Sequence, residues 1–293
     1  RAHETYRILV SVAAERAGGS LLRCYNRAMA NQSSKTINVG LFATCLVDLF
    51  RPTVGFAAAR LIEDAGGTVH VPEQTCCGQP AYNSGDNRNA RAIARSVIES
   101  FKNFDYVVVP SGSCGGMIAT HYPELFSDDP EWGGRARALA AKTFELTTFL
   151  ADVMKTTTSR AVYDGTATYH DACAGLRELG VRDQPRELLA AVENLDVVEM
   201  AETEACCGFG GTFCVKYGEI STDIVSRKTA NVVRTGADLL LAGDLGCLLN
   251  IAGRLKREGS SVQVRHVAEV LAGVTDDVPA IGEGGESRES GGV

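Results

Sequence analysis

The feature that most constrains the fold is a duplicated set of four cysteines. Each set has one cysteine, then an adjacent pair followed by glycine, and then a fourth cysteine. The first set is Cys45, Cys76, Cys77 and Cys114, and the second is Cys173, Cys206, Cys207 and Cys247. The pair comes 31 and 33 positions after the first cysteine, and the fourth comes 37 and 40 positions after the pair. Such a repeat indicates two copies of one structural unit.

Charge and hydropathy limit the classes of protein to which the chain can belong. Its formal net charge of −7 provides no basic face for a phosphate backbone, so a nucleic-acid partner is not expected. The apolar run at residues 8–14 is interrupted by Glu15 and Arg16, and no run approaches the roughly 20 residues of a membrane span. We therefore expect a cytoplasmic protein. In that reducing compartment, ten cysteines indicate metal ligands or redox thiols rather than a disulfide framework.

Short apolar segments alternate with stretches of helical period, which predicts an α/β fold. The expected strands are residues 37–43, 68–71, 106–109, 167–170, 196–200 and 238–242. Apolar residues recur at helical spacing over residues 90–101 and, less regularly, over 139–153. Together with the repeat, this pattern predicts two tandem, pseudo-symmetric domains, each a small parallel sheet flanked by helices.

The expected domain boundaries follow from composition. Residues 1–36 form an N-terminal extension without a regular apolar period, disordered or non-native before Met29, which looks like a natural start. The two cysteine-rich domains occupy residues 37–160 and 161–273. Residues 274–293 are rich in Gly, Glu and Ser, so we expect a disordered tail.

The cysteines of each set follow predicted strands. Because the carboxyl ends of parallel strands meet at one edge of the sheet, the four thiols of a set should converge there. Thiolates select zinc, copper(I) or iron–sulfur clusters. Two adjacent cysteines fit one tetrahedral zinc poorly, whereas a multi-iron cluster offers each thiolate its own iron. All eight cysteines are therefore expected to ligate iron–sulfur clusters, and a role as buried free thiols explains their arrangement less well.

Other candidate ligands have simpler interpretations. Cys24 has no counterpart in the second half and reads as an incidental thiol. Cys214 lies near the second adjacent pair without a matching cysteine in the first half, which favours a structural role. His170, three residues before Cys173, and His266 are expected to hydrogen-bond the backbone rather than to bind metal.

Several longer motifs carry a family resemblance. They are residues 42–45 (FATC), 76–85 (CCGQPAYNSG), 206–213 (CCGFGGTF), 247–251 (CLLNI) and 266–271 (HVAEVL). From about residue 37 to 273 the chain resembles the lactate utilization protein A (LutA/YkgE) family of the CCG cysteine-rich domain superfamily. The resemblance implies an iron–sulfur electron-transfer subunit in the oxidation of L-lactate to pyruvate. It also implies two clusters, a ferredoxin-like iron–sulfur partner subunit and a third subunit.

The chain also departs from a pattern in the wider superfamily. The related heterodisulfide reductase subunit ends each domain with Cys-x-x-Cys, where this chain has Met117 and Asn250. Five-thiolate ligation is thus unavailable from the matching positions, and two ordinary [4Fe-4S] clusters are the default expectation. No catalytic residue for lactate is assigned to this chain. A thiol–disulfide reductase subunit and a zinc-stabilised scaffold remain as alternatives.

Overall fold

The computed structural model describes residues 37–276 and 278–283. The predicted N-terminal extension, including Cys24 and Met29, lies outside these residues, as does the end of the predicted tail. Within the described part of the chain, no helix combines the length and the apolar character that crossing a membrane would require.

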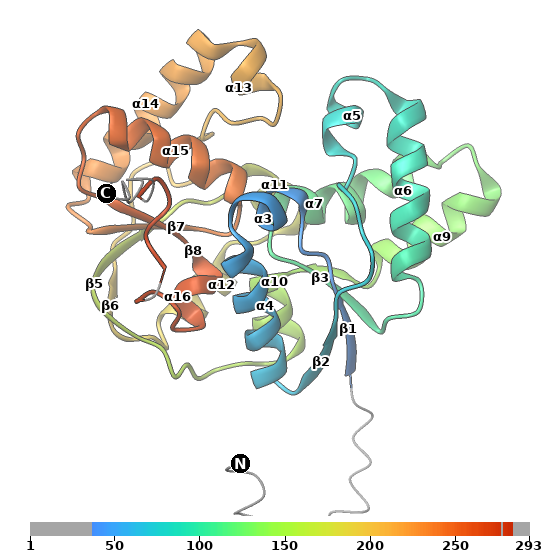
Figure 1. The fold of residues 1–293 in the computed structure, drawn as a ribbon, viewed down its shortest axis with the longest axis horizontal. Coiled ribbons are helices and arrows are strands. Elements are labelled where there is room, and N and C mark those ends of the chain that lie inside the picture. Colours follow the sequence, from blue (N-terminus) through green and yellow to red (C-terminus); the bar gives the residue numbers. More distant parts are fainter. Residues whose placement is uncertain (1–36, 277, 284–293) are drawn as a thin grey trace, which may run out of the picture. The chain divides into compact units, whose positions relative to one another are not determined.

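Two four-stranded parallel sheets form the framework, one in each half (Figure 1). The first sheet has the order β2-β1-β3-β4, with strands β1 (Ile37–Leu41), β2 (Gly67–His70), β3 (Tyr106–Val109) and β4 (Thr143–Glu145). The second has the order β6-β5-β7-β8, with strands β5 (Val162–Tyr169), β6 (Glu193–Val197), β7 (Leu239–Ala242) and β8 (Gln263–His266). The strand order is the same in both, which confirms the predicted α/β fold with two pseudo-symmetric domains.

Helices flank both sheets. Those that follow strands of the first half are α3 (Cys45–Phe50), α4 (Pro52–Asp64), α5 (Gln79–Asn83), α6 (Asn87–Phe101), α7 (Gly112–Gly116), the π-helix η1 (Met117–His121), α8 (Tyr122–Leu125), α9 (Pro130–Ala140), α10 (Leu146–Thr148) and the π-helix η2 (Phe149–Val153). Those of the second half are α11 (Cys173–Leu179), α12 (Asp183–Leu189), α13 (Phe213–Lys216), α14 (Gly218–Arg234), α15 (Leu245–Arg257) and α16 (Val267–Leu271).

Local sequence explains the main elements. β3 reads YVVV and β7 reads LLLA, and their buried apolar side chains suit central strands covered on both faces. Helices α7, α9 and α15 begin after Ser111, Asp129 and Asp244, whose side chains accept backbone N–H bonds from the first turn. These caps fix where each helix begins, and at Ser111 and Asp244 they lie where the chain leaves β3 and β7.

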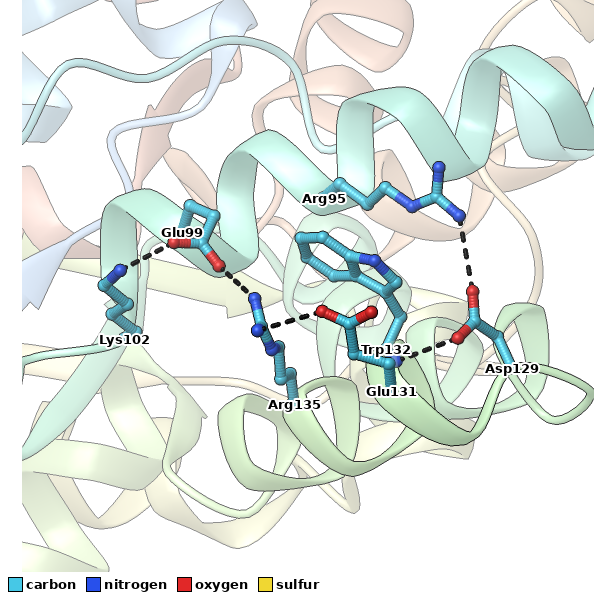
Figure 2. A network of polar contacts seen from close by, with 7 residues as sticks. All are labelled: Arg95, Glu99, Lys102, Asp129, Glu131, Trp132 and Arg135. Atoms are coloured by element: carbon cyan, nitrogen blue, oxygen red, sulfur yellow. Dashed lines mark hydrogen bonds and ion pairs between the residues drawn. The ribbon is translucent and has the colours of Figure 1, made fainter.

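Helices α6 and α9 are joined by a polar network on the first half (Figure 2). Arg135 bonds both Glu99 of α6 and Glu131 of its own helix, at 2.7 and 3.0 Å. The Trp132 ring lies under the guanidinium groups of Arg95 and Arg135, at 5.3 and 4.8 Å from its centroid. Because these pairs are partly exposed, we assign them a modest stabilising role.

Some predicted boundaries need correction. The predicted strand at residues 196–200 is displaced, because β6 runs from Glu193 to Val197. The predicted helical stretch over 139–153 is interrupted by β4, so Phe144 lies in a strand. The beginning of the predicted disordered tail is packed: Ala280 and Ile281 are buried, and Ile281 N–H donates to Val264 O at 2.8 Å.

The two halves share one hydrophobic core. A single cluster of buried side chains includes Val39 and Val108 from the first sheet and Leu239 and Val264 from the second. A second cluster lies within the first half, where α6 and α9 cover β3. The halves therefore pack as one unit rather than as two independent domains joined by a linker.

Candidate functional site

The eight repeated cysteines lie beyond the carboxyl ends of the strands. Cys45 and Cys173 are the first residues of α3 and α11, directly after the segments that leave β1 and β5. The fourth cysteines, Cys114 and Cys247, lie in the first turns of α7 and α15, after β3 and β7. The adjacent pairs follow β2 and β6 on loops. The topology thus brings both sets to the edge at which α/β sheets bind ligands, as expected from the sequence.

The sulfurs of the first set are in mutual contact. Cys77 Sγ lies 3.3 Å from Cys114 Sγ. Cys45 and Cys76 lie close enough for each thiol to shift the pKa of the other. Gly78 N–H donates to Cys76 Sγ at 3.4 Å, which supplies a backbone donor to a sulfur.

The second set repeats this geometry. Cys207 Sγ lies 2.9 Å from Cys247 Sγ, and Cys173 and Cys206 lie close enough to shift each other's pKa. Gly208 N–H donates to Cys206 Sγ at 3.3 Å. Each set therefore gathers four thiols and one N–H···S bond in the same arrangement.

The thiols shift one another's pKa values. Hydrogen bonds from Cys45 and Cys77 lower the pKa of Cys76 to about 2, and the bond to Cys76 raises that of Cys45, with burial adding to the rise. The same pattern holds in the second half, where bonds from Cys173 and Cys207 lower the pKa of Cys206 to about 2. The neighbouring thiols and burial therefore favour the neutral thiol at cysteines such as Cys45 and Cys77. Four thiolates together need a positive charge among them, which a bound metal supplies.

The glycine after each pair is required by backbone geometry. Gly78 and Gly208 have φ values of 84° and 80°, in the left-handed region that residues with a Cβ rarely adopt. At Gly208 a Cβ would also lie 2.7 Å from the carbonyl oxygen of Ser221. These glycines let the chain reverse directly behind the second cysteine.

The carbonyl of the second paired cysteine is held in both halves, but by different side chains. Tyr122 Oη donates to Cys77 O at 2.8 Å, and Asn250 Nδ2 donates to Cys207 O at 2.8 Å. Met117, the position matching Asn250, is fully buried in the core of the first half. Neither position adds a thiolate.

The donor sets fit a soft metal or an iron–sulfur cluster. Cys77, Cys207 and Cys247 are buried, whereas the other five repeated cysteines keep some exposure. Among the described residues, His170, Cys207 and Cys247 also offer ligand atoms within 4.8 Å of one another. Two soft four-thiolate sites, each partly shielded from water, are the chemistry that such cofactors require.

The remaining candidates differ from one another. Cys214 Sγ donates to the carbonyl of Gly211 at 3.3 Å, a local structural bond. His266 caps α16, because its Nδ1 accepts Ala268 N–H at 3.2 Å. His170 was expected to bond a backbone carbonyl, but neither of its ring nitrogens has a hydrogen-bond partner of normal geometry in the described structure. The sequence alone gave no sign of this, since the unpaired state depends on what the fold places around the ring.

Comparisons with known proteins agree with the duplicated arrangement. The CCG cysteine-rich domain family matches the chain twice, over residues 39–119 and 167–252. Two proteins called lactate utilization protein A, from Bacillus cytotoxicus and Geobacillus kaustophilus, are each 49% identical over 236 residues. Each alignment covers 80% of this chain and 98% of the relative.

A solved structure shares the fold. A hypothetical protein from Helicobacter pylori aligns with a TM-score of 0.61 at 11% identity, over 81% of this chain and 49% of that one. At that identity the match concerns the backbone arrangement alone.

Proposed function

This chain belongs to the CCG cysteine-rich domain family, and we propose that it is an iron–sulfur electron-transfer subunit of an L-lactate oxidation system. The observation that carries the proposal is the presence of two complete four-cysteine sets with the same geometry. The lactate assignment rests on relatives whose names refer to lactate utilization and which align over nearly their whole length.

In each set, a backbone N–H group would hydrogen-bond a sulfur and cysteine thiolates would bind the cluster. Four thiolates bind it, with Cys45, Cys76, Cys77 and Cys114 in the first half and Cys173, Cys206, Cys207 and Cys247 in the second. The N–H groups of Gly78 and Gly208 donate to sulfur, which is one of the ways in which proteins tune a cluster's potential. A bound cluster, by default [4Fe-4S], supplies one-electron transfer.

The chain would act with partner subunits. A ferredoxin-like iron–sulfur subunit and a third subunit would share the oxidation of L-lactate to pyruvate, and this chain would accept single electrons from them. The protein is then an oxidoreductase subunit in the cytoplasm, where reduced thiols are available for cluster assembly.

The test uses the anaerobically purified full chain together with the proposed ferredoxin-like and third subunits. Adding L-lactate should bleach the iron–sulfur absorbance of this chain, and D-lactate serves as the stereochemical control. A matched variant with all eight repeated cysteines changed to serine should show no change. Reduction by a dithiol or turnover of a disulfide substrate, without any response to lactate, would instead favour the thiol–disulfide reductase alternative. Colourless protein that contains zinc would favour the scaffold.

A further inference from the structure

The two sites differ at one matched position. Phe42 follows β1 and His170 follows β5, each three residues before the first cysteine of its set. Their backbones are placed alike, because Phe42 N–H donates to Val108 O at 2.9 Å and His170 N–H donates to Leu241 O at 2.8 Å. Both residues are almost fully buried, at 0% and 1% exposure. The fold therefore places a benzyl group in the first half where it places an imidazole in the second.

The two side chains have different surroundings. Phe42 packs against Phe101, with ring centroids 5.6 Å apart. The ring of His170 instead has a nitrogen within 4.8 Å of the sulfurs of Cys207 and Cys247. An imidazole carries at least one N–H whether it is neutral or protonated, so the buried ring is a donor in either state.

No backbone carbonyl in the described structure accepts the imidazole N–H with normal hydrogen-bond geometry. The carbonyl of Thr203 lies near the ring, but it already accepts Asp171 N–H at 3.2 Å and Lys228 Nζ at 3.1 Å. A buried donor without a partner is destabilising. The sulfurs of the second set are the neighbouring atoms that could accept it once they carry negative charge.

Charged groups around the second set do not account for the difference at this position. Lys228 Nζ is tied to the carbonyls of Glu202 and Thr203, and the Asp171 carboxylate is paired with Arg186 at 2.9 and 3.0 Å. Asp244, the negative group next to Cys247, accepts bonds from its own helix and from Ser111. All of them stay in place when only the ring at residue 170 is changed.

We propose that the His170 ring donates an N–H hydrogen bond to a sulfur of the group held by the second set, and so raises the reduction potential of that site. This deepens the proposed function and rests on it. A hydrogen-bond donor to sulfur stabilises the reduced form, because that form carries more negative charge. The donor therefore raises the reduction potential. At the matching position of the first site, the Phe42 side chain offers no N–H donor.

The central variant is His170→Phe, which gives the second site the residue of the first. We expect the reduction potential of the second site to fall by about 59 mV for one electron. At a fixed applied potential, the ratio of reduced to oxidised cluster then drops about tenfold. The potential of the first site should stay unchanged. Phe42→Leu is the matched control and should move neither potential, and His170→Gln, which keeps an N–H donor, should recover part of the loss.

Potentiometric titration followed by electron paramagnetic resonance measures the reduction potential of each site. Cys76→Ser protein, which should hold only the second cluster, identifies the signal of that cluster. The wild-type second site should also show a hyperfine-coupled exchangeable proton that His170→Phe lacks. Unchanged potentials in His170→Phe would overturn the inference, as would a 15N coupling large enough for a direct iron–nitrogen bond. If the His170→Phe protein loses its second cluster, its potential cannot be compared. The wild-type spectrum then decides, and absence of the exchangeable proton from it would overturn the inference. Wild-type protein that contains neither iron nor sulfide would contradict the proposed function itself. That result differs from one in which both clusters are present and only the effect of His170 is missing.

Discussion

Individual residues decide what each half of the molecule can bind. The eight repeated cysteines could be predicted from their spacing alone, because parallel topology brings the ends of separated strands to one edge. The unpaired ring of His170 could not, since its state depends on Thr203 and Lys228, which approach it from other segments.

A single cysteine substitution should empty one site only. Cys76→Ser should lose about half of the bound iron and leave the second set loaded, because no sulfur is shared between the sets. Cys206→Ser should give the opposite pattern, and both are measured by iron and sulfide analysis with electron paramagnetic resonance. Cys214→Ser is the control and should retain both clusters, since Cys214 bonds the Gly211 carbonyl instead. Equal loss of both clusters in Cys76→Ser would indicate a shared site.

Glu145 should make stability depend on pH. Complete burial raises the pKa of its carboxyl from 4.5 to about 7, and one of its oxygens, Oε1, has no partner in the described structure. The folded state then holds the proton more tightly than the unfolded state, so this group's contribution to stability is fully present below pH 4.5 and is lost as pH rises through 7. At about 1.4 kcal/mol per pKa unit, the loss from this group is about 3 kcal/mol.

The variant Glu145→Gln should remove that dependence. The amide oxygen can still accept the N–H groups of Thr147 and Thr148, so the cap of α10 is kept. Urea unfolding at pH 5 and pH 8 should show a gain in stability relative to wild type that appears mainly at pH 8. An equal effect at both pH values would show that the carboxyl does not titrate in this range.

At the scale of elements, the sequence predicted the central strand β3 better than the edge strands β4 and β8. β3 at residues 106–109 matches its prediction, because a run of β-branched residues bounded by polar ones leaves little ambiguity. β4 and β8 are short edge strands that mix polar and apolar residues, and both are followed at once by a helix. Their position is fixed by pairing with β3 and β7, which is a tertiary effect.

The contact between α7 and α11 depends on two glycines. A Cβ on Gly112 would lie 2.7 Å from Gly175 Cα and 2.8 Å from its nitrogen, and these backbone atoms cannot rotate away. Gly112→Ala should therefore destabilise the protein, by about 1–3 kcal/mol as overpacking does, in urea or thermal unfolding. The control is Gly134→Ala in α9, where nothing lies within 4 Å. That change should stabilise by about 0.5–1 kcal/mol, and equal effects of the two would refute the close contact.

For the whole molecule, the shared core and polar ties across the halves indicate cooperative unfolding. Ser111 Oγ donates to Asp244 Oδ2 at 3.0 Å, which links the caps of the two helices that carry the fourth cysteines. Arg51 and Thr53 of the first half bond Glu269 of α16, whose side chain is fully buried. Sequence analysis predicted two domains but not these ties, because residues so far apart in the chain give no local signal.

Removing Glu269 should weaken both halves together. Glu269→Ala leaves the Arg51 charge largely buried without its partner, so we expect a loss of about 3–5 kcal/mol. The loss of stability should appear as faster amide hydrogen exchange in both β1 and β7. Arg227→Gln, which breaks an exposed pair with Asp223, is the control and should cost less than about 1 kcal/mol. Faster exchange in one half only would mean that the halves unfold independently.

The most direct test of the central claim is the metal and sulfide content of the full chain purified without oxygen and reconstituted with iron and sulfide. Two four-thiolate sites predict about eight irons and eight acid-labile sulfides per folded chain, as two [4Fe-4S] clusters require. Folded protein that resists reconstitution and contains zinc or no metal, without sulfide, would contradict the account.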